Sequence, residues 1–292
     1  MAAGRGPLVL DDASRGRAFK HEICGDFGNA GPDTGTLDYS DLVRVLLVAT
    51  TDGLEKLYPP DLARFNLSSR DRVPARSGHP VRTLAERVGA IFGVNDFQFF
   101  VQPAHQGRLE VEFTDPISII VPRYLSRLAE PQQVFLLGRV MSDIARQTYA
   151  VDRLTPQELG TFLQAALCSA RPGLGPTNAE SESLREYARK VYKSLSRRGR
   201  RGLEEVAERY HPTTKLDPVD WVHKTKMAGA RTALIVADEL AGCVTLLRQT
   251  EGDLAGIDAA TAGRGVATAQ DLLRFWISET AMSLRHRLGL AG

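Results

Sequence analysis

The chain has 292 residues, 43% of them hydrophobic and 25% charged, which is typical of a globular protein long enough to bury a sizeable core. Its 37 Lys and Arg residues nearly balance 35 Asp and Glu, so the net charge of +2 gives no global attraction to nucleic acid or to an anionic membrane. The sequence has no run of 18 apolar residues, which excludes a membrane-spanning helix. Its three cysteines are widely spaced, which favours a reducing cytoplasm over a disulfide framework.

The sequence predicts three regions along the chain. Residues 1–36 are rich in Gly, Asp and Arg and lack hydrophobic periodicity, so we expect a flexible tail or linker. Residues 37–79 form a helical lead-in, which begins with an amphipathic helix over 37–57. Residues 80–292 make the main domain, which opens with a second amphipathic helix.

Three strand candidates follow that helix. Residues 97–101 are aromatic and β-rich, 109–113 alternate between apolar and polar, and 117–121 are almost continuously apolar. Gly107 indicates a hairpin loop over 104–108, between the first two runs. We expect a small antiparallel or mixed three-stranded sheet within a mostly helical α+β fold.

The most pronounced helical pattern, residues 132–150, follows the third strand and begins after Pro131. Apolar residues recur on it at three- and four-residue spacing, so one stripe faces a core, and we expect the sheet to pack on this central helix. Capping signals and amphipathic patterns predict further helices over residues 155–167, 184–195, 203–210, 217–237, 238–247 and 268–289.

This order of elements resembles the core of the gluzincin metallopeptidases. In that family the central helix carries His-Glu-x-x-His, whose histidines bind zinc and whose Glu activates the zinc-bound water. A later helix adds a Glu ligand and, four residues on, an Asp that orients a ligand. The matching positions of this chain hold Gly138, Arg139, Ser142, Met227 and Arg231. The resemblance therefore implies a gluzincin-like core with a degenerate active site that has no metal, no cofactor and no peptidase activity.

The chain is also similar to the C-terminal domain of some bacterial tetratricopeptide-repeat proteins. This similarity lies in short phrases: Leu-Leu-Gly-Arg at 136–139, Asp-Leu-Leu-Arg-Phe at 271–275 and Arg-Leu-Gly-Leu at 287–290. It implies a bacterial protein. The sequence itself contains no repeat of constant period.

Two interpretations of the central helix stay open. Gly138, Ser142 and Ala145 form a track of small residues that lets another helix approach closely, which explains them as packing residues. The same positions also fit a residual ligand pocket in a retained cleft. The six histidines are scattered without a pair at four-residue spacing, and no metal site is predicted.

The predicted function is that of a non-catalytic interaction or scaffold module in the cytoplasm. Ile117, Ile119 and Val121 directly precede the central helix, at the place where the resembled family has an edge strand that binds substrate. We therefore expect an exposed edge here, to which a peptide partner adds a strand. One alternative is an enzyme with unmapped chemistry in the cleft. Another is a binder of nucleic acid or of an acidic partner.

The residues for that last alternative lie in one basic stretch. They are Lys190, Lys193, Arg197, Arg198, Arg200 and Arg201. They also fit a solvated helix C-terminus, where cations offset the macrodipole, because Gly199 indicates a helix end. A phosphate-binding patch needs the charges on one face, and no set of aromatic stacking residues is interleaved with them.

Overall fold

The computed structural model describes residues 39–102, 109–171, 174, 181–210, 217–250, 267–287 and 290. The predicted tail over 1–36 and the predicted hairpin loop over 104–108 lie outside these ranges. The helices are α2 (Tyr39–Leu57), α3 (Pro80–Phe92), α4 (Glu130–Arg146), α5 (Pro156–Ala170), α6 (Ser181–Ser194), α7 (Arg197–Arg209), α8 (Pro218–Ala237), α9 (Leu240–Thr250), α10 (Ala267–Trp276) and α11 (Glu279–Arg287). The strands are β1 (Gln98–Gln102), β2 (Glu110–Glu112) and β3 (Ser118–Pro122). The prediction of a mostly helical α+β fold with a small three-stranded sheet is confirmed.

Several helices begin and end at the residues that capping chemistry favours. Thr155 and Glu158 exchange hydrogen bonds at the start of α5, where the Thr155 hydroxyl accepts from the Glu158 N–H and the Glu158 carboxylate accepts from the Thr155 N–H. The side chain of Asp217 accepts from the Asp220 N–H at the start of α8. Gly93 ends α3 in the left-handed conformation, with φ of 69°. These limits are therefore set by local interactions.

β3 is the central strand of the sheet, whose order is β1-β3-β2. It pairs in parallel with β1 and antiparallel with β2, so β1 and β2 are not neighbours. The predicted hairpin of the first two strands is wrong, and so is the predicted exposed edge at Ile117, Ile119 and Val121. All five residues of β3 are buried. A strand that is covered on both faces and paired on both edges is apolar without alternation, as this one is.

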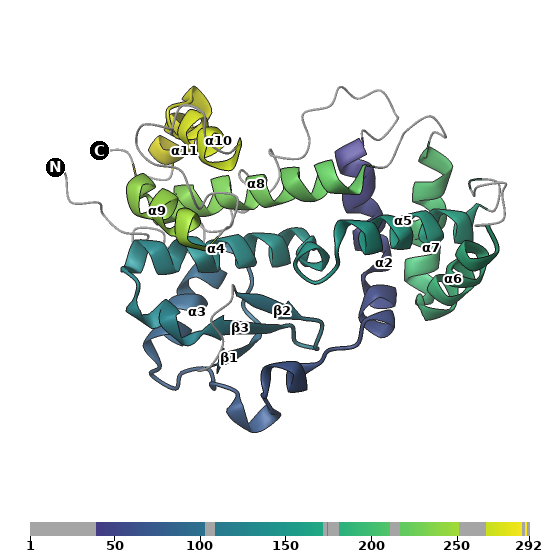
Figure 1. Cartoon of the computed structure of the whole chain (residues 1–292), viewed down its shortest axis with the longest axis horizontal. Coiled ribbons are helices and arrows are strands. Elements are labelled where there is room, and N and C mark those ends of the chain that lie inside the picture. Colours follow the sequence, from purple (N-terminus) through teal and green to yellow (C-terminus); the bar gives the residue numbers. More distant parts are fainter. Residues whose placement is uncertain are drawn as a thin grey trace.

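α4 lies at the centre of the molecule, with the sheet on one side and α8 on the other (Figure 1). The larger hydrophobic core joins the sheet, α3, α4 and the apolar half of α8 to α9, α10 and α11. Phe99, Ile119 and Val121 contribute to this core from one face of the sheet. The predicted packing of the sheet against the central helix is therefore present. None of the described helices is both long and apolar enough to cross a membrane.

A second hydrophobic core joins α2 to α5, α6, α7 and the first turn of α8. The lead-in helix α2 packs against α6 and α7, which lie about 140 residues later in the chain (Figure 1). Trp221 and Val222, near the start of α8, belong to this core. The long helix α8 thus contributes to both cores, at opposite ends.

The central helix and the predicted last helix differ from their predicted limits for physical reasons that the structure shows. α4 ends at Arg146, four residues before the predicted limit, because Gln147 adopts the left-handed conformation with φ of 58°. The predicted last helix is divided into α10 and α11. The Ser278 hydroxyl accepts from the Ala281 N–H at 3.2 Å, and this cap starts α11.

Candidate functional site

The seam between α4 and α8 is the place where the gluzincin resemblance puts a zinc site. The two helices run antiparallel, since Gly138 lies against Ala233 while Arg146 reaches the carbonyl oxygen of Thr225. A Cβ atom on Gly138 would lie 3.1 Å from the Ala233 Cβ and 3.3 Å from the Ala233 Cα. The helices therefore approach each other so closely that glycine is the residue that fits here without displacement.

Ser142 lies one helical turn after Gly138 and is completely buried. Within the described part of the chain, its hydroxyl has no hydrogen-bond partner. A buried hydroxyl without a partner costs about 1–3 kcal/mol of stability. The small volume of Ser142 suits the close packing at the seam, whereas its hydroxyl does not stabilise the fold there.

Two of the degenerate positions carry arginines that interact outside the seam. The guanidinium of Arg139 lies 5.9 Å from the ring centroid of Phe135, and Arg139 is partly exposed. Arg231 forms a two-point ion pair with Asp271 of α10: its Nε donates to Oδ2 at 2.6 Å and its Nη2 to Oδ1. A bidentate pair of this kind is geometrically specific. Arg231 therefore fastens α10 to α8.

Met227 is buried but does not lie opposite Gly138. The α8 residue that faces Gly138 is Ala233, and Gly229 faces Asp143. Six residues separate Met227 from Ala233 in the sequence, which is about 9 Å along a helix axis. The structure thus brings Gly138 and Ser142 to the seam but leaves Met227 more than one turn along α8 from the residue that faces Gly138.

A buried polar network, which the sequence analysis missed, holds the far end of the same seam. Asp143 is 5% exposed, and its Oδ1 accepts from Arg146 Nη2 at 2.7 Å and from Thr148 Oγ1 at 3.1 Å. Arg146 Nη2 also reaches the carbonyl oxygen of Thr225 at 3.3 Å. A Cβ on Gly229 would lie 3.4 Å from the same nitrogen. The ion pair therefore fills the space that Gly229 leaves, and it ties α4 to α8.

In the part of the chain that the structure describes, no three His, Cys, Asp or Glu residues are placed to hold a metal ion. No protein-family model matches the chain. Comparisons with curated proteins and with solved structures gave no significant match either. The gluzincin resemblance and the likeness to repeat-protein C-terminal domains therefore stay predictions.

The arginines of the basic stretch lie at the start of α7, which corrects the predicted helix end at Gly199, whereas Lys190 and Lys193 lie in the last turns of α6. α6 ends at Ser194, and α7 begins at Arg197. Gly199 is inside α7, where a Cβ would lie 2.9 Å from the carbonyl oxygen of Ala49 on α2. This glycine therefore permits close packing and does not stop the helix. The arginines stand at the helix end that disfavours positive charge.

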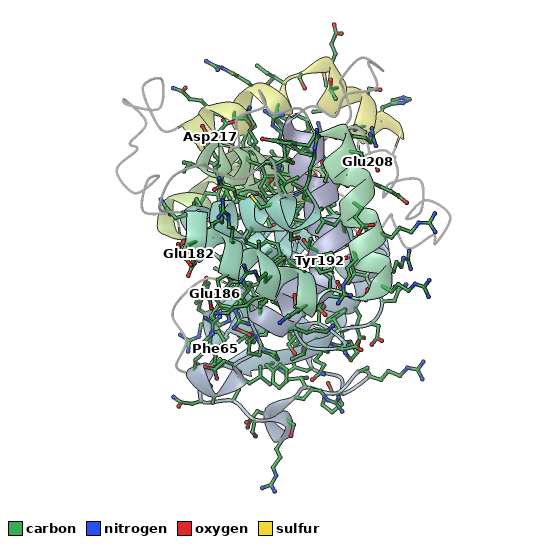
Figure 2. The ribbon with its side chains drawn as sticks, turned by 90° about the vertical axis from the view of Figure 1, so that its right-hand side faces the viewer. Phe65, Glu182, Glu186, Tyr192, Glu208 and Asp217 are labelled. Carbon is green, nitrogen blue, oxygen red and sulfur yellow. The ribbon has the colours of Figure 1, made fainter. Side chains whose placement is uncertain are left out.

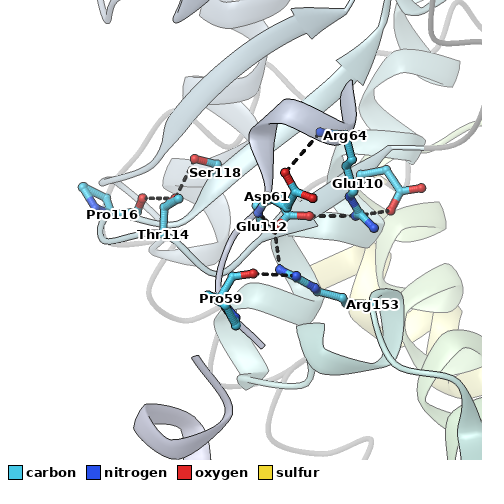
Figure 3. Close-up of polar contacts among 9 residues, drawn as sticks. All are labelled: Pro59, Asp61, Arg64, Glu110, Glu112, Thr114, Pro116, Ser118 and Arg153. Atoms are coloured by element: carbon cyan, nitrogen blue, oxygen red, sulfur yellow. Dashed lines mark hydrogen bonds and ion pairs between the residues drawn. The ribbon is translucent and has the colours of Figure 1, made fainter. Parts of the chain in front are cut away.

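A second buried charge cluster surrounds Glu112 on β2 (Figure 3). Its side chain is completely buried, and its Oε1 lies 2.7 Å from Arg64 Nη2. Its Oε2 accepts from Arg153 Nη1 and, at 3.0 Å, from the backbone N–H of Asp61. Arg153 Nη2 also donates to the Pro59 carbonyl oxygen at 2.6 Å. The cluster thus fastens the segment around residue 60 to the edge of the sheet.

The alternation of apolar and polar residues in β2 does not predict that Glu112 is buried. Alternation predicts a solvated polar face. In the structure the segment before α3 covers that face, with Phe65 and Leu67 packed on Phe100 of β1 and Ile120 of β3.

Proposed function

We propose that the protein is a non-catalytic interaction module with a gluzincin-like core, in which helix packing occupies the place of the zinc site. The observation that carries the proposal is the close contact of Gly138 with Ala233. Zinc needs three or four ligands that converge at about 2.0–2.3 Å from one point. Gly138 and Ser142 supply no ordinary zinc ligand, and Met227 lies more than one helical turn from Ala233, the residue that faces Gly138.

Exposed surfaces on two parts of the molecule support an interaction role. Leu273, Ile277 and Met282 are exposed on α10 and α11 and in the turn between them, and Ile277 is 73% exposed. Single exposed apolar side chains are ordinary, but several on consecutive helices are typical of contact surfaces. The second surface is the cationic start of α7. The peptide-binding edge predicted at β3 has no part in this proposal, because that strand is central.

The cysteines support placing the module in the cytoplasm. Cys168 and Cys243 are both unpaired and buried. Burial raises the pKa of both thiols, so neither is suited to redox chemistry or to nucleophilic attack. Free thiols are typical of proteins in a reducing compartment.

The test is the metal content of the purified chain after exposure to zinc and removal of unbound metal. We expect no stoichiometric zinc by elemental analysis, no hydrolysis of a mixed peptide substrate, and the same melting temperature with and without chelator. One equivalent of zinc accompanied by chelator-sensitive melting would refute the proposal. Hydrolysis that survives chelation would instead support the alternative of an enzyme with other chemistry.

A further inference from the structure

The first two turns of α7 carry a glycine pair that packs against α2. A Cβ on Gly199 would lie 2.9 Å from the Ala49 carbonyl oxygen, and one on Gly202 would lie 3.5 Å from the Ala49 Cβ. The Ser196 N–H donates to Asp52 of α2 at 2.6 Å, and the Ser196 hydroxyl caps the Gly199 N–H at 3.0 Å. The start of α7 is therefore held in one orientation against α2.

Because the glycines face α2, the arginines interleaved with them face away from it. Figure 2 shows this end of the molecule, where nitrogen-tipped side chains extend from α7 below the labelled Glu208. Arg200 is partly buried, with its guanidinium 4.7 Å from the centroid of the Tyr192 ring. We define the basic face as the exposed cations of this region: Arg189, Lys190, Lys193, Arg197, Arg198 and Arg201.

The basic face concentrates positive charge that the rest of the chain lacks. Residues 189–201 contain seven Lys and Arg and no Asp or Glu, whereas the rest of the chain has 30 Lys and Arg against 35 Asp and Glu. Lys190 pairs with Glu186 at 3.0 Å, and Arg201 pairs with Glu205 at 3.2 Å. Exposed pairs of this spacing are worth only about 0.3–0.5 kcal/mol, so a polyanion displaces them readily.

The explanation that cations only finish a helix fits Arg189, Lys190 and Lys193, which lie near the C-terminus of α6, but it does not fit the arginines at the start of α7. Cations near a helix N-terminus oppose the macrodipole, at a cost of about 0.3–1 kcal/mol each for those in the first turn. Three other helices follow the opposite rule, since α4 has Glu130, α5 has Glu158 and α8 has Asp220 in the first turn. Local rules are typically broken at functional sites, where another interaction compensates.

We infer that the basic face binds the phosphate backbone of a nucleic-acid duplex without reading its sequence. The apolar residues of α6 and α7 belong to the second core, so the basic face lacks the apolar centre that protein interfaces have. Arginine is suited to bidentate contacts with phosphate. The ring of Tyr192 lies under Arg200 and is not free to stack on a base, which favours a duplex over a single strand.

Fluorescence anisotropy with labelled DNA and RNA duplexes of roughly 20 base pairs and unrelated sequences tests this inference. If each of the six exposed cations neutralises one phosphate, the plot of log K against log salt has a slope of about −5. Affinity should then fall about 10³-fold between about 50 and about 200 mM salt. Two unrelated sequences should bind equally.

The variant Arg197→Gln/Arg198→Gln/Arg201→Gln keeps both glycines and the Arg200 contact. Its slope should be about −3, and its affinity should fall only about 40-fold over the same salt range. The matched control is Arg70→Gln/Arg123→Gln/Arg127→Gln, which removes three exposed arginines elsewhere and should keep the parent slope.

Three results would overturn the inference. The first is absence of duplex binding at about 50 mM salt. The second is an equal slope for the parent and the α7 variant. The third is binding of a poly-glutamate peptide or of anionic vesicles without binding of the duplex, which would assign the face to another partner. None of these results depends on the α4–α8 seam. The duplex-binding inference can therefore be refuted while the proposed function stands, and the reverse also holds.

Discussion

Removal of the Glu112 carboxylate should be among the most destabilising single changes of charge in this protein. Loss of one partner from a buried ion pair costs about 3–5 kcal/mol, because the other charge stays buried without compensation. Of the two arginines, Arg64 is 40% exposed and can turn into solvent, whereas Arg153 is 13% exposed and stays enclosed. Because only Arg153 would stay buried without a partner, Glu112→Gln should lower the free energy of unfolding by about 3 kcal/mol, the lower end of this range.

Urea unfolding followed by circular dichroism at neutral pH measures this loss. Arg64→Gln is the matched control and should cost about 1 kcal/mol or less, because the exposed partner of the cluster contributes little. The double variant Glu112→Leu/Arg153→Met removes both enclosed charges and should recover most of the stability. If Glu112→Gln costs no more than Arg64→Gln, the carboxylate is solvated and the reasoning from burial is wrong.

Three other changes test the remaining contacts. Gly138→Val should lower the free energy of unfolding by about 1–3 kcal/mol, because the added methyl groups crowd Ala233. Ala233→Gly in the same chain should recover part of this loss. Equal stability of Gly138→Val and the parent would show that the two helices are not in close contact at this point. Ser142→Ala should leave stability unchanged or raise it in the same urea assay, since its hydroxyl has no described partner, and a clear loss would reveal one. Thr155→Ala should cost about 1 kcal/mol by unfolding at about pH 6. Hydrogen bonds from Thr155 lower the pKa of Glu158 below its ordinary 4.5, so the stabilisation is present above that value and is lost as the pH falls below it. The cost of Thr155→Ala should accordingly shrink at about pH 3, and a constant difference would contradict the capping box.

Local signals in the sequence were enough to predict most of the helices. Capping residues such as Thr155 and Asp217 act within one turn, and Gly93 needs only its own left-handed backbone to end a helix. The same reasoning failed at Gly199. A glycine indicates a helix end locally, but here its missing side chain admits the Ala49 carbonyl oxygen of a distant helix. The physical reason is that glycine can either end a helix or permit close packing inside one. Only the position of the neighbouring helix distinguishes the two cases.

The order of the strands, and the register of α4 against α8 at the candidate site, could be known only from the tertiary structure. The apolar run of β3 indicated burial, but pairing with β1 and β2 on both edges depends on contacts that no local pattern encodes. The sequence likewise singled out Gly138 and Ser142 as small residues on one helix face. Only the packing of α4 on α8 decided that Ala233, and not Met227, lies opposite Gly138, because the register of two helices is set by the interlocking of their side chains.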